Sequence, residues 1–212
     1  MLSFQEFFAA CAGVWTTERT YHFVQESEIE RSYTEFNVDA LTETEKQRIL
    51  VPSDETSEGR FQVDTSKMSQ GICPGFQIAF DTVSDKGERV AMTLKALFVP
   101  DEYIEVSEAI AQPPLPLAAQ IPTEPIGDVI QGFYLRDQGY SEAGAIAGRF
   151  TYQPVRQTLE MTTHYKRSVA VDQMRLISPD LRMRTIVTYQ RPEANQVPSI
   201  ITLIGFGVEH KQ

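Results

Sequence analysis

The chain has 212 residues, 42% of them hydrophobic, and its 19 Lys and Arg against 29 Asp and Glu give a formal net charge of −10. This length suits one all-β domain with a sizeable core, and the acidic balance argues against nucleic acid or an anionic membrane surface as partner. The two cysteines are too few for a disulfide framework, and the sequence contains neither a signal peptide nor a membrane-spanning run. It therefore predicts a soluble protein of a reducing compartment.

Two short helices are predicted in the first quarter of the chain, each beginning with a capping box. Ser3 and Glu6 form the first S-x-x-E pattern, and Thr42 and Glu45 form a T-x-x-E pattern that starts the second. The second helix is expected to end before Pro52, because proline cannot continue a helix.

Most of the remaining chain is predicted to form β-strands. The candidate segments are rich in Val, Ile, Thr, Phe and Tyr, with partial alternation and turn residues between them. They are 14–25, 28–39, 60–66, 75–82, 88–99, 101–110, 128–137, 145–153, 156–167, 168–178, 181–191 and 199–209. Hairpin turns are expected at 85–87 and 179–180.

Two segments are predicted to be loops, the polar segment 53–60 and the segment 111–127, which contains five prolines and is expected to be a long ordered loop or flap. Regularly spaced strands with two short helices favour a closed antiparallel barrel of about eight to ten strands. Charged residues within strands 28–39 and 181–191 indicate a wet or ligand-filled lumen.

Neither a nucleophile nor a metal site is indicated by the usual patterns. Cys11 lies near the C-terminal end of the first helix, where the dipole disfavours a thiolate, and Cys73 lies in a turn, so both are interpreted as small buried residues. The three histidines form no pair with metal-ligand spacing, and no glycine-rich phosphate loop is present.

Arg182 and Arg184 are the strongest local signal for ligand binding. Residues two apart in a strand share a face, so the two guanidiniums lie about 7 Å apart and can clamp two carboxylates of one ligand. The alternative is a solvated outer face. Asp172 shares the face of both arginines if the turn before them has three loop residues (179–181), and lies on the opposite face if it has two. The sequence leaves this register open.

The first strand carries Trp15, Arg19 and His22. Trp15 and Arg19 share one strand parity, and His22 has the other. Trp15 follows Gly13 in a G-x-W pattern that lipocalins have in their first strand, where the indole plugs the end of the barrel. A structural plug and a ligand contact are therefore both open for Trp15.

The chain resembles the CpcS/CpeS family of phycobiliprotein chromophore lyases, the S/U-type bilin lyases, over nearly its whole length. The stretches that carry the resemblance are 13–38, 132–152, 159–187 and the closing GFGVEH. They contain, in family order, the patterns G-x-W, R-T-x-H, G-Y-x-E, T-x-Y and S-P-D-L-R-x-R. This combination is specific when it is complete.

The resemblance implies a ten-stranded, lipocalin-like barrel, similar to a fatty-acid-binding protein, that forms one bilin-binding domain over residues 1–212. It also implies an enzyme that attaches phycocyanobilin or a related bilin by a thioether to a phycobiliprotein cysteine. The bilin is the substrate, no separate cofactor is expected, and the acceptor is a subunit of phycocyanin or allophycocyanin. The implied setting is the cyanobacterial cytoplasm or the plastid stroma.

The same resemblance assigns roles to residues of the site. Arg182 and Arg184 match the family's two arginines and are expected to bind the propionates. Asp172 is expected to be the catalytic residue, because it can accept hydrogen bonds from the pyrrole nitrogens and handle their proton. The further candidate ligand-binding residues are Arg19, His22, Trp15 and Tyr165.

The chain departs from the family pattern directly after Asp172. The family has Glu in an E-R-x-W-F stretch, whereas this chain reads D-Q-M-R-L over 172–176 and lacks the Arg, the Trp and the Phe. Two assignments therefore stay open. One is a lyase that acts alone or as a homodimer, and the other is a U-type subunit that needs an S-type partner.

Two further functions remain as alternatives, a non-catalytic carrier of a bilin or a fatty acid and a structural interaction protein without a ligand. A fatty acid needs one cation and an apolar lumen, whereas a bilin needs two cations and a carboxylate. The combination of Asp172, Arg182 and Arg184 therefore favours a bilin.

Overall fold

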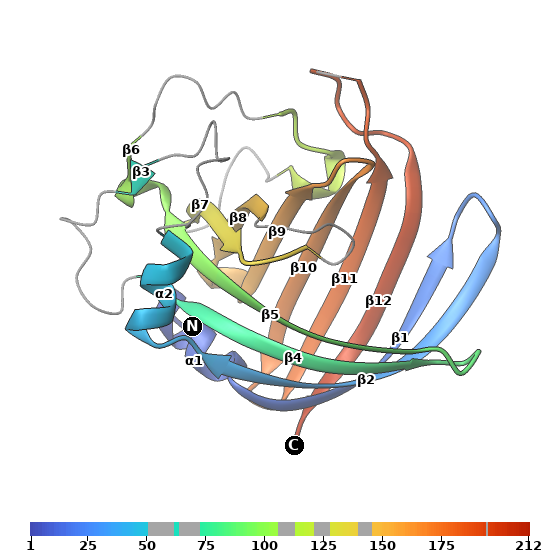
Figure 1. Ribbon diagram of the computed structural model, residues 1–212, viewed down its shortest axis with the longest axis horizontal. Helices are drawn as coiled ribbons and strands as arrows, with labels where there is room; N and C mark the ends of the chain where they lie inside the picture. Colours follow the sequence, from blue (N-terminus) through green and yellow to red (C-terminus); the bar gives the residue numbers. More distant parts are fainter. Residues whose placement is uncertain (51–61, 64–72, 106–112, 121–127, 140–145, 194) are drawn as a thin grey trace.

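The computed structural model describes residues 1–50, 62–63, 73–105, 113–120, 128–139, 146–193 and 195–212. Antiparallel strands close into a ten-stranded barrel with the order β1-β12-β11-β10-β9-β8-β7-β5-β4-β2 around the wall (Figure 1). The barrel strands are β1 (Gly13–Phe23), β2 (Glu28–Ala40), β4 (Gly75–Ser84), β5 (Arg89–Pro100), β7 (Ile130–Arg136), β8 (Ile146–Gln153), β9 (Thr158–His164), β10 (Ser168–Ser178), β11 (Leu181–Gln190) and β12 (Ile201–Lys211). The predicted all-β barrel is confirmed.

Helix α1 (Phe4–Cys11) fills one end of the barrel with aromatic side chains. Its capping box forms as expected, because the Ser3 hydroxyl accepts from the Glu6 amide and the Glu6 carboxylate accepts from the Ser3 amide. The ring of Phe4 stacks on Phe150 of β8 with centroids 5.4 Å apart, and that of Phe8 lies 4.7 Å from Phe98 of β5. These aromatic contacts place the helix within the main apolar core of the barrel.

Helix α2 (Glu43–Leu50) lies on the outer side of the barrel (Figure 1). Thr42 and Glu45 form the second predicted capping box. Together with the small sheet of β3 (Gln62–Val63) and β6 (Ile104–Glu105), the helix covers an apolar cluster that includes Leu97 and Val99. The side chains of Leu97 and Val99 are fully buried, although they point away from the lumen.

The strand predicted at 101–110 is wrong at its beginning. Residues Asp101–Tyr103 form a 3-10 turn (η1), in which the Asp101 carboxylate accepts from the Arg149 guanidinium at 2.6 Å. Residues 104–105 follow as strand, and the rest of this predicted strand lies outside the described residues. The strand predicted at 156–167 is shortened to β9, because a second 3-10 turn (η3, Pro154–Arg156) precedes it.

The described part of the proline-rich segment, residues 113–120, contains the 3-10 turn η2 (Leu117–Ala119) and no strand, as predicted. Ala119 is buried against the outer face of β10 in a cluster with Val169 and Val171. The side-chain amide of Gln173 donates to the Ala118 carbonyl at 3.2 Å. The rest of this segment, the loop at 53–60 and most of the strand predicted at 60–66 lie outside the described residues.

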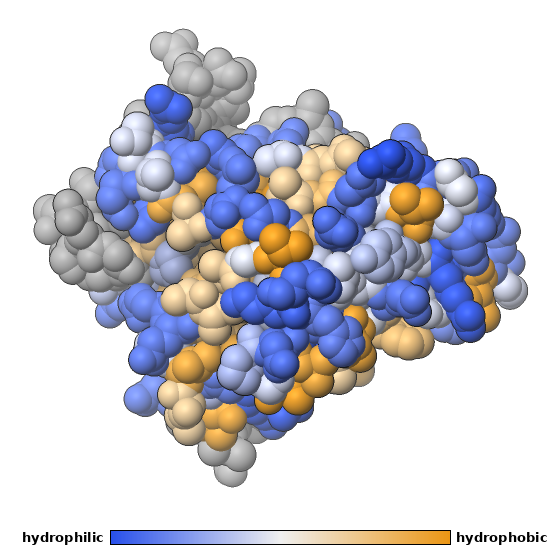
Figure 2. Space-filling view, turned by 90° about the horizontal axis from the view of Figure 1, so that it is seen from below, coloured by the Kyte–Doolittle hydropathy of each residue, from blue (hydrophilic) through white to orange (hydrophobic). Residues whose placement is uncertain are grey.

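The outer face of β12 carries exposed apolar side chains, namely Ile204, Phe206 and Val208. Seen from below Figure 1, the surface shows apolar areas interspersed with hydrophilic ones (Figure 2). None of the helices in the described part of the chain has the length and apolar character needed to cross a membrane.

Candidate functional site

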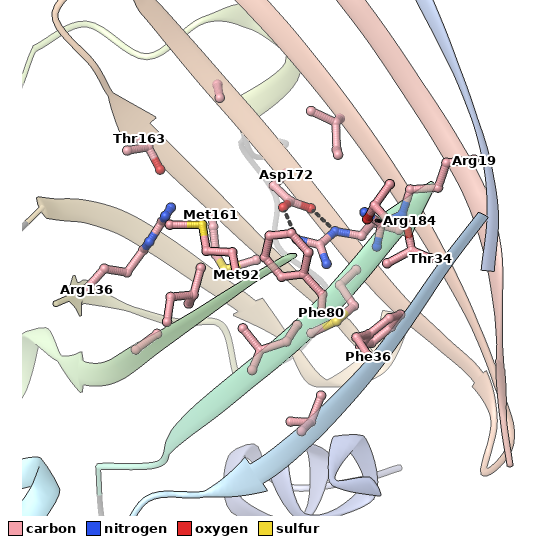
Figure 3. A pocket seen from close by; sticks show the side chains of 18 of the residues that line it. Arg19, Thr34, Phe36, Phe80, Met92, Arg136, Met161, Thr163, Asp172 and Arg184 are labelled. Carbon is pink, nitrogen blue, oxygen red and sulfur yellow. Dashed lines mark hydrogen bonds and ion pairs between the residues drawn. The ribbon is translucent and has the colours of Figure 1, made fainter. Parts of the chain in front are cut away.

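The barrel encloses a cavity of about 440 Å³. Its lining combines apolar side chains, among them Phe80, Met92 and Met161, with charged groups at two places (Figure 3). A cavity of this size with a few converging polar groups is typical of a small-molecule site. Among the described residues, no group of three His, Cys, Asp or Glu side chains is arranged to hold a metal ion.

Asp172 of β10 and Arg184 of β11 form a bidentate ion pair on the cavity wall (Figure 3). Arg184 Nε donates to Asp172 Oδ1 at 2.9 Å, and Nη2 donates to Oδ2. The Arg184 side chain is 12% exposed and that of Asp172 is 18% exposed, so a ligand in the lumen can reach both. The pair holds one acceptor and one donor group in fixed positions at the cavity surface.

A second charged cluster lies beside this pair, where Glu209 of β12 contacts two arginines. Arg182 Nε donates to Glu209 Oε2, and Arg19 Nη2 donates to Oε1 at 3.0 Å. The Glu209 side chain is fully buried and that of Arg182 is 2% exposed, whereas Arg19 retains 14%. Arg19 Nε is buried and has no hydrogen-bond acceptor among the described residues, so Arg19 has donor capacity that Glu209 does not use.

The arginines keep Glu209 ionised in spite of its burial. Burial opposes ionisation, but the positive charges of Arg182, Arg184 and Arg19 outweigh it and lower the pKa of Glu209 below its ordinary value. Three guanidiniums thus face the two carboxylates of Glu209 and Asp172. Among these five side chains, the guanidiniums outnumber the carboxylates by one.

Arg182 is held on both sides by aromatic rings. Its Cζ lies 4.3 Å from the Trp15 ring centroid and 5.4 Å from that of Phe36. Trp15 is itself fully buried and donates from its indole nitrogen to the Cys11 carbonyl at 3.0 Å. Stacking and the bond to Glu209 fix the guanidinium of Arg182, so its first role is structural.

Gly207 makes room for Arg19. The two residues are cross-strand partners in β12 and β1, and a Cβ at position 207 would lie 2.8 Å from the Glu18 carbonyl oxygen and 3.0 Å from Arg19 Cγ. A larger residue would therefore displace the strand or push Arg19 away from Glu209.

The β10–β11 hairpin puts Asp172 on the same face as Arg182 and Arg184. It does so through a strand register that differs from both of those considered from the sequence. The turn has two residues, with Ser178 opposite Leu181, and a bulge at Ile177 then pairs Leu176 with Arg182. A two-residue turn alone would have turned Asp172 outward, and the extra residue of the bulge reverses the parity. The three-residue loop considered from the sequence is not formed, although Asp172 lies on the face that this loop would have given it.

The structure brings five of the seven predicted site residues to the cavity wall. Those that line it are Asp172, Arg182, Arg184, Arg19 and Tyr165. Trp15 lies behind the wall and supports Arg182. His22 has the opposite parity in β1, and its ring stacks on exposed Phe206 of the outer face with centroids 6.0 Å apart. We therefore leave His22 out of the site.

Two charged residues at the cavity were not anticipated. Glu209 completes the arginine cluster, and Arg136 of β7 lines the opposite wall, where its Nη1 donates to the Tyr165 hydroxyl at 3.1 Å. Alternation along β12 places Glu209 on the same face as Gly205 and Gly207, which is the one signal in the sequence that suggests an inward position.

Both cysteines are buried in the thiol form. Cys11 borders the cavity, but desolvation raises the pKa of its thiol even though Arg182 lies nearby. Burial raises the pKa of Cys73 to about 12. Neither thiol is suited to act as a nucleophile, in agreement with the interpretation from the sequence.

Comparisons with known proteins agree with this architecture. The model of the family described as CpeS-like protein matches residues 3–105 and 117–211. Chromophore lyase CpcS/CpeS 1 of Synechococcus sp. is 39% identical over 208 residues, which cover 98% of this chain and 96% of that protein. Chromophore lyase CpcS/CpeS 2 of Synechocystis sp. is 26% identical over 180 residues, which cover 85% of this chain and 77% of that protein.

A solved structure shares the fold. The structure of the S-type phycobiliprotein lyase CPES from Guillardia theta aligns with a TM-score of 0.64 over 100% of this chain and 93% of that chain. The sequence identity of the two chains is 16%, so this likeness concerns the barrel and its connections alone.

Proposed function

Because the chain belongs to the CpcS/CpeS family of chromophore lyases, we propose that it binds phycocyanobilin or a related bilin in the barrel and promotes its attachment to a cysteine of a phycobiliprotein subunit. The proposed acceptors are subunits of phycocyanin or allophycocyanin. The setting we propose is the cyanobacterial cytoplasm or the plastid stroma.

The Asp172–Arg184 pair carries this proposal. A bilin presents carboxylates and pyrrole N–H groups close together on one flexible molecule, and the pair offers a guanidinium and a carboxylate side by side at the cavity wall. Asp172 accepts hydrogen bonds from the pyrrole nitrogens and stabilises their protonated form, while Arg184 and Arg19 contact a propionate. A fatty acid has no N–H group that could donate a hydrogen bond to Asp172.

The chemical step adds a thiol across a carbon–carbon double bond. The acceptor thiolate attacks the exocyclic carbon of the ethylidene group, the carbon–sulfur bond forms, and the displaced π electrons take up a proton at the neighbouring ring carbon. No electrons leave the system, so no oxidant or reductant is required. The barrel contributes by holding the bilin in one conformation and excluding water from all but its reacting edge.

Titration of the protein with phycocyanobilin tests the binding step. We expect a shifted and sharpened visible absorption spectrum that saturates at about one bilin per chain or heterodimer. Asp172→Asn should retain binding, because the guanidinium contacts remain, but should change the absorption of the bound bilin, because the charge facing the pyrrole nitrogens is lost. An unchanged spectrum on titration of the unaltered protein would contradict the proposal.

Transfer to an apo-phycobiliprotein subunit distinguishes a lyase from a carrier. We expect slow transfer by this chain alone, because Asp172 is one methylene shorter than the Glu of the family, and faster transfer when an S-type lyase is added. Rapid and correct attachment by the isolated chain would exclude the accessory-subunit role and retain the lyase. Binding without transfer under either condition would establish a carrier instead.

A further inference from the structure

Tyr21 of β1 lines the cavity two residues along the strand from Arg19. Residues two apart in a strand share a face, so both side chains point into the lumen. Tyr21 is partly buried, and its hydroxyl forms no hydrogen bond within the part of the chain that the structure describes. A phenol can both donate and accept, so Tyr21 keeps its hydrogen-bonding capacity for a ligand.

Gly205 of β12 provides the space that the Tyr21 ring occupies. The two residues are cross-strand partners. A Cβ at position 205 would lie 2.7 Å from Cδ1 and 2.8 Å from Cε1 of Tyr21, which is closer than van der Waals contact allows. The glycine therefore lets one edge of the ring rest against the backbone of β12, and a side chain at this position would displace the ring.

The strand registers place Tyr21 in the same row across the wall as Asp172. Tyr21 pairs with Gly205 between β1 and β12. Gly205 pairs in turn with Ile186 of β11, and Ile186 pairs with Asp172 of β10. Three inter-strand spacings separate the ends of this row, roughly 14 Å along the wall. A bilin whose inner pyrrole nitrogens face Asp172 brings a terminal ring to Tyr21 when it extends along this row.

The terminal rings of a bilin are lactams, each with one carbonyl oxygen. This oxygen is a neutral acceptor and matches a neutral donor such as a phenol, whereas the guanidiniums of the site match the charged propionates. Two other hydroxyls of the cavity, those of Thr34 and Thr82, lie 2.8 Å apart and bond to each other. The Tyr21 hydroxyl is not engaged in this way, and its ring adds an aromatic surface on which a pyrrole can pack.

We propose that Tyr21, seated on Gly205, donates a hydrogen bond to the carbonyl of a terminal lactam ring of the bilin. This inference rests on the proposed bilin-binding function and adds a contact for the end of the ligand. The propionate bound by Arg19 and Arg184 then lies in the next row of the wall, on either side of Gly207. The two contacts together fix the direction in which the bilin lies in the lumen.

The test is the infrared difference spectrum of bound phycocyanobilin, which reports the stretching frequency of the lactam carbonyls. We expect Tyr21→Phe, which keeps the ring and removes the hydroxyl, to raise the frequency of one carbonyl. Affinity, measured by absorption titration, should fall roughly two- to tenfold, the range for one neutral hydrogen bond. Tyr33→Phe is the matched control, because Tyr33 lies on the outer face of β2 and is 48% exposed, and it should change neither quantity.

Gly205→Ala tests the seat of the ring while keeping the hydroxyl. After thermal unfolding has shown that it is folded, this variant should reproduce the higher carbonyl frequency, and it should add no further change in the Tyr21→Phe background. Tyr21→Phe is decisive even if Gly205→Ala does not fold. A carbonyl frequency that Tyr21→Phe leaves unchanged, or that Tyr33→Phe raises equally, would overturn the inference and leave the proposed function in place. Failure of the unaltered protein to bind phycocyanobilin would overturn both.

Discussion

Glu209 and Glu160 are both buried glutamates, yet they lie on opposite faces of the barrel wall and their pKa values are shifted in opposite directions. Glu209 faces inward with no exposed surface, among three arginines that lower its pKa although burial opposes this. Glu160 of β9 faces outward beneath residues 113–120, is 6% exposed and accepts a hydrogen bond from Gln173. Burial raises the pKa of Glu160, and the bond from Gln173 offsets this only in part.

The difference shows that neighbouring cations, and not the degree of burial, set the direction of the pKa shift of these two carboxylates. Burial acts on both residues in the same direction. The lumen differs from the outer site because β1, β11 and β12 bring guanidiniums and a carboxylate together. A cluster that stays charged in the interior is a prepared electrostatic site, whereas Glu160 belongs to the packing of an outer segment.

The largest effect is expected from Glu209→Gln, which removes the charge that compensates Arg182. Arg182 is 2% exposed, and breaking a buried ion pair from one side costs about 3–5 kcal/mol. Urea unfolding at pH 7 measures the change in the free energy of unfolding. Glu18→Gln, on the exposed outer face of β1, is the matched control and should change stability by no more than about 0.5 kcal/mol.

The pH dependence gives the same comparison a second test. Because the folded-state pKa of Glu209 lies below the ordinary value of 4.5, its contribution is complete above that pH and is lost as the pH falls through the lowered value. The stability difference between the unaltered protein and Glu209→Gln should therefore be constant from pH 8 to about pH 5 and shrink only below about pH 4.5. A difference that vanishes near neutral pH would contradict a charged Glu209.

Local signals in the sequence predicted the parts of the fold that depend on neighbouring residues. The capping boxes at Ser3 and Thr42 were sufficient for both helices, and alternation along β1 separated Arg19 from His22. These patterns succeed because each depends on geometry within one element.

Contacts between distant strands could not be predicted in this way. Arg19 meets Glu209 across 190 residues, and Arg136 reaches Tyr165 from another strand, so neither contact leaves a local pattern. The face of Asp172 depended on a bulge at Ile177, which the sequence pattern of an apolar strand does not reveal. The sequence therefore indicated most of the arginines and Asp172, but the ion pairs between them and the part played by Glu209 depend on the strand registers of the closed barrel.

An intermediate effect is expected from Arg184→Gln. This substitution tests whether the arginines of the lumen bind a ligand in addition to pairing with the carboxylates of the site. We expect bilin affinity to fall by about 1.5–3 kcal/mol, the range for one charge-assisted hydrogen bond. Arg89→Gln is a matched control, because Arg89 forms the same kind of bidentate pair with Asp81 on the exposed outer face. Equal losses in the two variants, measured by absorption titration, would show that the effect does not come from the lumen.

The smallest effect, and one of opposite sign, is expected from Glu160→Gln. The glutamine keeps an oxygen that can accept from Gln173, but it removes the buried charge, so the variant should be more stable at pH 7 by about 0.5–2 kcal/mol.

The raised pKa of Glu160 means that protonation favours the folded state below the ordinary value of 4.5 and that this advantage is lost as the pH rises through the raised value. The gain from the substitution should therefore be largest at neutral and higher pH and disappear toward about pH 4.5. Urea unfolding across this range measures it, with Glu35→Gln on the exposed face of β2 as control. A loss of stability at pH 7 would mean that a cation stabilises the Glu160 carboxylate, and would remove the contrast with Glu209.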